Sequence, residues 1–144
     1  MPNDAWYGQL IGAHFDSHPA PEAGDVISET ENAGHYILSV GQNEERRRSG
    51  WLDEWYEFKQ HPRGNEKLRV LLKRDQRTSD GVREPRDQPL AWYQEFEGGR
   101  VMYTALGHFS EAWGVEWFAG IVERGILWAA RREGGSSEAV SEVL

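Results

Sequence analysis

The chain has 144 residues and a formal net charge of −8 at pH 7. This suits a single domain and argues against a nucleic-acid partner, because phosphate binding requires clustered Lys and Arg side chains. The chain contains no cysteine, which excludes disulfides, zinc–thiolate and iron–sulfur sites and a cysteine nucleophile. No stretch approaches the roughly 18 consecutive apolar residues of a membrane span, and no signal peptide is evident, so we expect a cytoplasmic protein without a membrane partner.

The first half of the chain is predicted to combine one helix with loops and short strands. Trp6, Leu10 and Ile11 form the apolar stripe of the helix, and Pro19 and Pro21 then prevent further helix. The predicted elements are a helix capped by residue 3 or 4 that frays near residue 12, a loop at 14–24, strands at 26–30 and 36–40, and a loop at 41–50 with a solvated basic cluster at 46–48.

The second half shows clearer periodicity. Two β-rich runs separated by Gly98 and Gly99 predict an antiparallel hairpin. Apolar residues then recur at steps of three and four, which predicts an amphipathic helix. The predicted elements are an aromatic segment at 51–58, a buried strand at 68–73, a polar connection at 74–88, hairpin strands at 89–96 and 100–106, and a helix from about 114 to 131. Together they indicate an α/β layer structure with a mixed sheet.

His108 is the first candidate for chemistry, because it follows Gly107 directly after a predicted strand. Ligands of open α/β sheets bind outside the carboxyl ends of strands, and histidine exchanges protons and binds metals near neutral pH. The alternative is a helix-entry residue whose side chain only satisfies the backbone.

Asp53 and Glu54 are the second candidates, because adjacent carboxylates among aromatic residues suit acid–base chemistry. In an extended segment they face opposite sides, so only one of them can point into a pocket. The alternative is an exposed acidic pair beside core aromatic residues.

The remaining histidines give weaker signals. His14 and His18 have the four-residue spacing of a metal-binding pair on a helix, but the prolines after His18 place it outside the helix. His35 and His61 have no ligand pattern nearby, and we assign them structural or solvent-facing roles.

The seven tryptophans suggest stacking against sugar rings. Trp6, Trp92 and Trp117 lie on core-like periods, so the core is the better interpretation for them. Trp55 and Trp113 lie beside the candidate acids and His108, and both roles stay open for them. Nucleotide-binding, zincin and nucleophile-elbow motifs are absent.

Four segments in this order resemble the trehalose-utilisation (ThuA-like) family: WYGQLIGAHFDSHP, DEWYEF, PLAWYQEFEGGRVMYTALGH and GILWAA. The strongest single match is GGRVMYTALGHFSEAW. The resemblance implies a class I glutamine-amidotransferase-like, flavodoxin-like fold, with a mixed sheet, flanking helices and a C-terminal antiparallel hairpin. On this basis we expect a ThuA-like domain over residues 1–131 and a flexible tail over 132–144.

The resemblance also implies a site at the strand ends. Carried over, it assigns catalysis to His108, Glu54 and Asp53, and it implies action on trehalose or a related disaccharide, including 3-keto forms, by acid–base or metal-assisted chemistry. The predicted substrate contacts are His18, Trp55, Tyr56 and Trp113. The set of His18, Glu54 and His108 has the ligand types that suit a divalent metal such as zinc.

Two departures from the family pattern change these expectations. Without cysteine the chain is not a Cys-dependent amidotransferase. The family domain normally begins with earlier strand–helix units, so the chain matches its C-terminal part. An uncovered sheet edge would then invite pairing with a second copy, giving a homo-oligomer. The alternative function is a non-catalytic sugar-binding module or a truncated remnant of such an enzyme.

Overall fold

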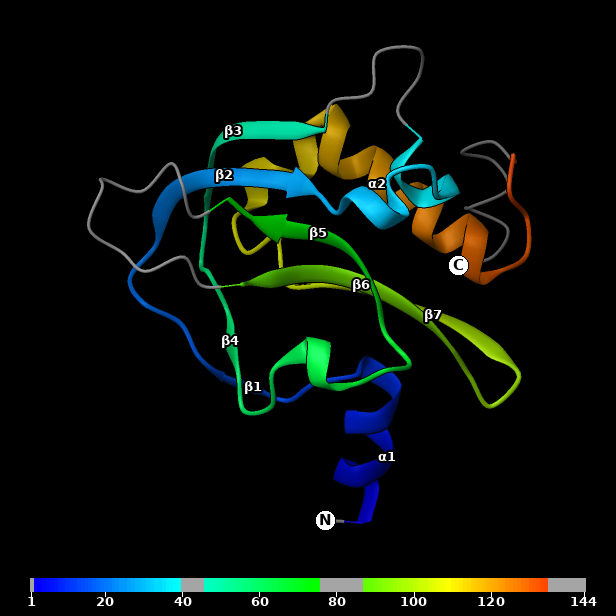
Figure 1. Ribbon diagram of the computed structural model, residues 1–144. Coiled ribbons are helices and arrows are strands. Elements are labelled where there is room, and N and C mark those ends of the chain that lie inside the picture. The colour runs from blue at the N-terminus through cyan, green and yellow to red at the C-terminus, as the bar shows by residue number, and fades with distance from the viewer. Residues whose placement is uncertain (1, 40–45, 76–86, 135–144) are drawn as a thin grey trace.

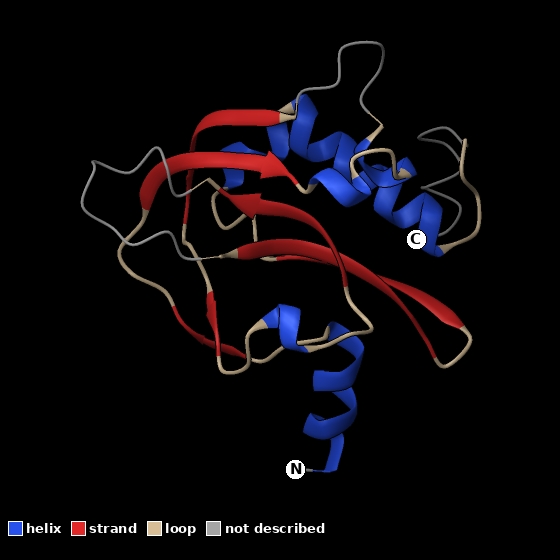
Figure 2. Ribbon diagram, in the orientation of Figure 1, coloured by secondary structure: helices blue, strands red, loops and turns tan. Residues whose placement is uncertain are grey.

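The computed structural model describes residues 2–39, 46–75 and 87–134, and its centre is a five-stranded sheet with a helix on either side (Figures 1 and 2). The helices and strands are α1 (Pro2–Ile11), β1 (Phe15–Ser17), β2 (Glu22–Ser28), β3 (Arg47–Asp53), β4 (Glu57–Phe58), β5 (Arg69–Arg74), β6 (Pro89–Phe96), β7 (Gly99–Thr104) and α2 (Glu116–Ala129). Short 3₁₀ helices are η1 (Thr30–Asn32), η2 (Tyr36–Leu38), η3 (Pro62–Gly64) and η5 (Ser110–Gly114).

The strand order of the large sheet is β3-β2-β5-β6-β7, and β1 and β4 form a separate pair. Every strand pair among the described residues is antiparallel. The expected α/β class and the C-terminal hairpin are therefore confirmed, whereas no parallel pair of the expected flavodoxin-like mixed sheet occurs in the described part of the chain. The physical reason is connectivity, since the described links between neighbouring strands contain no crossover helix of the kind that parallel pairing needs.

The β6–β7 hairpin follows the predicted turn chemistry. Phe96 pairs with Gly99, so Glu97 and Gly98 form a two-residue loop, and both have positive φ angles of 49° and 80°. Such a loop matches the twist of the strands, and its glycine costs no strain. Trp6 Nε1 donates a hydrogen bond to Glu97 Oε2 at 3.1 Å, which joins α1 to the hairpin tip.

The main core lies between α2 and the sheet. Leu71 of β5 and Leu90 of β6 are fully buried, and Phe118 and Ile121 of α2 are 1% exposed. These positions follow the predicted periodicity, one continuously apolar strand and one amphipathic helix. The predictions for residues 68–73, 89–106 and 114–131 are thus confirmed as to the type of element.

A second, smaller core lies on the α1 side of the sheet. Trp92 of β6 packs with Ala13 and Leu68, and its Nε1 donates to the carbonyl of Ile11 at 2.7 Å. Gln94 Nε2 donates to the carbonyl of Leu10 at 2.8 Å. Because the last carbonyls of a helix have no partner within it, these two side chains hold the end of α1, and with it the start of β1, against the sheet.

Four sequence predictions about the fold are wrong. The predicted loop at 14–24 contains β1 and the start of β2. Residues 36–38 form the 3₁₀ helix η2 instead of a strand, because His35 Nδ1 accepts a hydrogen bond from Ile37 N and caps a helical turn. Trp6 is 48% exposed at the surface of α1 instead of lying in the core. Arg47 is part of β3, where it pairs with Asp25 and Asp75, instead of belonging to a solvated loop.

Parts of four predictions lie outside the described residues, namely residue 40 of the predicted strand, 41–45 of the predicted loop, 76–86 of the polar connection and 135–144 of the tail. Across the described ranges, no helix has the length and apolar character that crossing a membrane would require.

Candidate functional site

Three polar side chains from distant segments meet beside the large sheet. His18 follows β1, Glu54 follows β3, and His108 lies just beyond β7. His18 Nε2 lies 3.2 Å from Glu54 Oε2, and His108 Nε2 lies 3.2 Å from Glu54 Oε1. Each oxygen of one carboxylate therefore faces one imidazole, and we call these three residues the His–Glu–His cluster. Their side chains are 34%, 13% and 47% exposed in the same order, so the two imidazoles are open to solvent.

One hydrogen bond of the His18 ring fixes which of its nitrogens carries a hydrogen. Its Nδ1 is 2.8 Å from the carbonyl oxygen of Pro19, and because a carbonyl only accepts, Nδ1 carries a hydrogen. Nε2 is the ring nitrogen that faces Glu54 Oε2, at 3.2 Å. Imidazole and carboxylate are the side-chain groups that most often transfer protons in enzymes.

Asp53 is fully buried and positions the loop that carries His108. Oδ2 accepts hydrogen bonds from Trp51 Nε1 and Gly107 N, each at 2.8 Å. Oδ1 accepts from Glu54 N at 2.9 Å and from His108 N at 3.2 Å. The prediction that only one acid of the pair faces outward is consistent with this geometry. The catalytic role predicted for Asp53 is corrected to a positioning role, because a carboxylate with 0% exposure and four donors has no access to a substrate.

Gly107 is required by this loop. Its φ is +100°, and a Cβ atom at this position would lie 2.6 Å from Phe118 Cζ. A left-handed conformation and a close approach both select glycine. Its carbonyl accepts a hydrogen bond from Trp113 Nε1 at 3.1 Å, which ties the Trp113 ring, 53% exposed, to the loop that carries His108.

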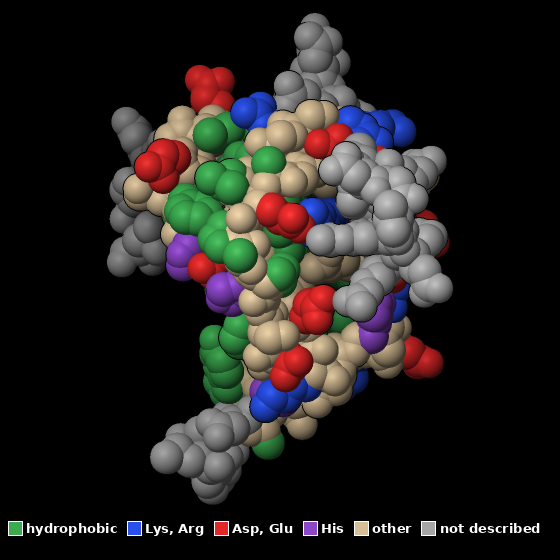
Figure 3. Space-filling model, turned by 90° about the vertical axis from the view of Figure 1, so that its left-hand side faces the viewer, with side chains coloured by type: hydrophobic (Ala, Val, Ile, Leu, Met, Phe, Trp, Pro, Cys, Tyr) green, Lys and Arg blue, Asp and Glu red, His purple; other side chains and the backbone are tan. Residues whose placement is uncertain are grey.

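Aromatic rings border the cluster on the side of β1 and β4. The Tyr56 ring stacks on His18 with centroids 6.0 Å apart and planes at 24°, and Phe15 lies 4.6 Å from Tyr56. Partial burial raises the pKa of Tyr56, and the charges of Glu54 and Asp53 raise it further, so this phenol stays neutral. Figure 3 shows histidine and acidic side chains beside hydrophobic ones on this side of the molecule.

The sequence prediction was incomplete for these rings. Phe15 was missed because the prolines suggested a loop where β1 forms, although apolar Phe15 between polar neighbours is a weak strand signal. Trp55 does not line the site as predicted. It is fully buried, its Nε1 donates to the Glu22 carbonyl at 2.8 Å, and Arg74 Cζ lies 4.4 Å from the ring centroid.

His14 lies outside the cluster, and the cluster differs from a metal site in its geometry. His14 Nδ1 contacts Gln60 Oε1 at 3.3 Å, and β1 lies between His14 and His18, so the two are not on one helix, as the prolines predicted. Among residues 2–39, 46–75 and 87–134, no group of three or more histidine or acidic side chains is arranged to hold a metal ion. The cluster has the right donor types, but its atoms face one another in pairs instead of a common point.

The fold is that of an α/β domain, with the His–Glu–His cluster beyond the ends of its strands. A family model described as ThuA, trehalose utilisation, matches residues 1–129, and the chain belongs to this family. No curated protein matches it.

A solved structure of a putative ThuA-like protein from Bacteroides uniformis is similar to the chain, with a TM-score of 0.68 and 19% identity. The alignment covers 90% of this chain and 53% of that chain, so our chain spans about half the length of that protein. At this identity the similarity establishes the fold alone.

Proposed function

We propose that this chain acts on trehalose or a related disaccharide, including 3-keto forms, by acid–base chemistry at the His–Glu–His cluster. The observation that carries the proposal is the carboxylate of Glu54, which faces His18 with one oxygen and His108 with the other at 3.2 Å. The family described as trehalose utilisation supplies the substrate class.

The geometry suggests a role for each residue. His108 is the most exposed of the three groups and is the one that meets the substrate. Glu54 accepts the proton of His108 Nε2 or returns one to it. His18, held in place by the contact of its Nδ1 with the Pro19 carbonyl, acts as a second proton donor to Glu54. General acid–base catalysis of this kind contributes about 10²–10⁴-fold to a rate.

The divalent metal predicted from the ligand types stays a separate proposal. Because the described groups pair with one another, we derive no step through a metal. Elemental analysis of the purified protein, together with its melting temperature with and without zinc, tests this proposal. Bound zinc and a raised melting temperature would support a metal, whereas no zinc and no shift would remove it.

The second candidate function is sugar binding without turnover. The rings of Tyr56 and Phe15 beside the cluster favour it, because aromatic faces bind the apolar faces of sugars without any chemistry. The two functions differ in one measurable property, since a binding module retains affinity for the disaccharide but converts none of it.

The experiment is a ligand and turnover screen of the full chain with trehalose and 3-keto-disaccharides, with and without divalent metals. The variants are His108→Ala and, as a matched control, His14→Ala, which changes a histidine outside the cluster. We expect His108→Ala to fold normally and to lose turnover by about 100-fold or more, and His14→Ala to keep it. Equal activity of His108→Ala and the unmodified chain would overturn the proposal.

A further inference from the structure

A hollow lies beside the His–Glu–His cluster and shares Tyr56 with its surroundings. It has a volume of about 190 Å³ and is lined by Tyr56, Glu57, Phe58, His61, Pro62, Asp87, Gln88 and Pro89. The lining combines the rings of Tyr56, Phe58, Pro62 and Pro89 with four polar side chains. The volume is below the ~300–1,000 Å³ of pockets that enclose a whole drug-sized ligand, so the hollow suits a fragment the size of one ring.

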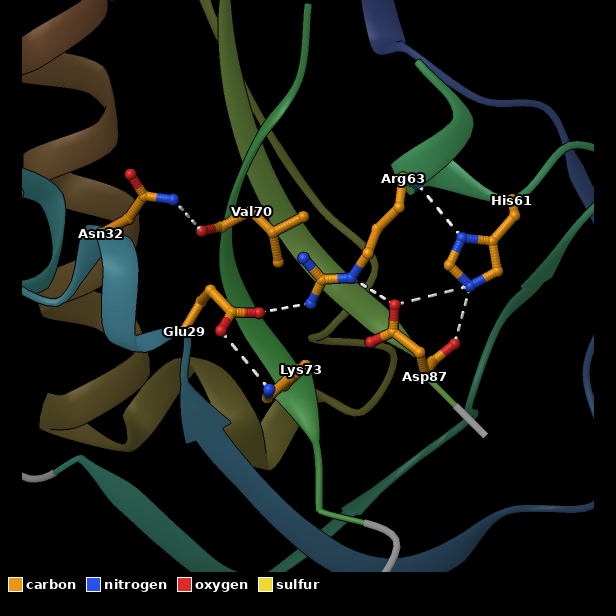
Figure 4. A network of polar contacts seen from close by, with 7 residues as sticks. All are labelled: Glu29, Asn32, His61, Arg63, Val70, Lys73 and Asp87. Atoms are coloured by element: carbon orange, nitrogen blue, oxygen red, sulfur yellow. Dashed lines mark hydrogen bonds and ion pairs between the residues drawn. The ribbon is translucent and has the colours of Figure 1, made fainter. Parts of the chain in front are cut away.

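The Asp87 carboxylate of this hollow is held in place by the side chain of Arg63. Arg63 Nε donates to Asp87 Oδ2, and Arg63 NH2 donates to Glu29 (Figure 4). Lys73 Nζ contacts the second oxygen of Glu29 at 3.4 Å. Asp87 is therefore the outer end of a chain of alternating charges that begins at the 9% exposed Glu29, and it is fixed in place before a ligand arrives.

The charges of this chain balance. Burial alone would raise the pKa of Glu29, but the hydrogen bond and charge of Arg63, with Lys73, lower it below the usual 4.5, so Glu29 stays ionised. Two carboxylates thus face two cations. The contact with Asp87 raises the pKa of Arg63. A carboxylate compensated in this way offers no excess charge to attract a cation.

His61 adds a neutral wall. Its Nδ1 accepts from Arg63 N at 3.2 Å, and its Nε2 lies 2.9 Å from the Asp87 carbonyl oxygen, to which it donates. One donating and one accepting nitrogen describe the neutral imidazole. Among the described residues, the contacts recorded for the Asp87 carboxylate fall on Oδ2, which leaves Oδ1 to accept hydrogen bonds from a ligand.

These features select a neutral ligand with hydroxyl groups and an apolar face, which is the chemistry of a sugar ring. Tyr56 connects the hollow to the cluster, because it lines the hollow and its ring also stacks on His18. We infer that this hollow is the subsite for the second ring of the disaccharide, with the Asp87 carboxylate accepting its hydroxyl groups. The inference rests on the proposed function, which places the first ring at the His–Glu–His cluster.

Calorimetry of the full chain with two probes, trehalose and the single-ring methyl α-glucoside, tests the inference. The variant is Asp87→Asn. The matched control is Glu133→Gln, which makes the same change in the Arg100–Glu133 ion pair, with 39% exposure of the acid against 38% for Asp87. We expect Asp87→Asn to weaken trehalose binding about tenfold, as loss of a charge-assisted hydrogen bond does. Binding of methyl α-glucoside by this variant, and both bindings by Glu133→Gln, should be unchanged.

A second measurement needs no variant. Diethyl pyrocarbonate acylates accessible histidines, and mass spectrometry of peptides reports each one separately. We expect trehalose to protect His61, His18 and His108, and methyl α-glucoside to protect only the last two.

The outcomes separate the inference from the function on which it rests. If trehalose protects His18 and His108 but not His61, and binds Asp87→Asn as tightly as the unmodified chain, the subsite is wrong and the proposed function stands. If neither sugar binds the unmodified chain, both are overturned.

Discussion

At the scale of single residues, Asp53 and Glu54 are neighbours in the sequence with opposite surroundings. Asp53 is fully buried and accepts four N–H donors, whereas Glu54 faces two imidazoles near the surface. Alternation along an extended segment produces this difference. Asp53 therefore holds the loop that carries His108, and Glu54 is the residue to which the proposed function assigns proton transfer.

Replacement of Asp53 tests the positioning role. Asp53→Asn places an amide NH₂ against backbone and indole donors, so at least one buried donor loses its acceptor. We expect the free energy of unfolding to fall by about 3 kcal/mol, measured by urea denaturation. A loss below about 1 kcal/mol would show that Asp53 does not hold the loop.

At the scale of elements, β5 is the middle strand of the large sheet, and its side chains differ sharply in burial from those of the edge strand β3. Leu71 of β5 is fully buried, whereas Leu52 of β3 is 52% exposed. We expect Leu71→Ala to destabilise the protein by about 3 kcal/mol because it leaves a cavity. Leu52→Ala, the matched control, should change stability by less than about 0.5 kcal/mol. Thermal or chemical unfolding of the two variants measures both values, and equal losses would contradict this core.

The cap of η2 predicts a pH dependence. Burial lowers the pKa of His35 below its usual 6.5, and the charge of Arg100 lowers it further. The folded state therefore favours the neutral imidazole, whose Nδ1 accepts from Ile37 N. Its contribution to stability is complete above pH 6.5 and is lost as the pH falls through the lowered pKa of the folded state.

We expect the melting temperature to fall on acidification below pH 6.5, and to fall less in His35→Asn, which retains an acceptor at the cap but does not titrate. Melting curves between pH 4 and pH 8 check this expectation. Parallel profiles for the two proteins would show that His35 is not the titrating group.

At the scale of the whole molecule, the outer strands of the large sheet are β3 and β7, and each pairs on one side within the described residues. Outer strands of this kind can pair with another chain, so the homo-oligomer expected from the sequence stays a prediction. Light scattering over a range of concentrations should give a mass above that of one chain. A single-chain mass at every concentration would contradict it.

The sequence predicted most reliably what local physics determines. Apolar runs and helical periodicity identified β5, β6, β7 and α2, and the glycine pair identified the hairpin. Outside the hairpin, it did not predict the pairing direction of the strands, since periodicity carries no information about topology. It also missed η2, where the side chain of His35 replaces a strand contact with a cap.

The same distinction applies to the site. The residue types and the family resemblance brought together His18, Glu54 and His108, which the structure places in contact. The sequence predicted both Trp55 and Tyr56 as substrate contacts, because both are aromatic residues beside the candidate acids. Only the packing of the fold shows that Trp55 is buried. The link between His61 and Asp87 crosses 26 residues, and no local pattern indicates it.

The most direct measurement of the central claim is the turnover of trehalose and 3-keto-trehalose by the unmodified chain and by Glu54→Gln, followed by NMR of the sugars. The amide keeps the shape of the side chain but neither stores nor returns a proton. The account predicts conversion of at least one of these sugars by the unmodified chain. It also predicts that kcat/KM falls by about 100-fold or more in Glu54→Gln. Equal kcat/KM values for the two proteins, or no conversion of either sugar by the unmodified chain, would contradict it.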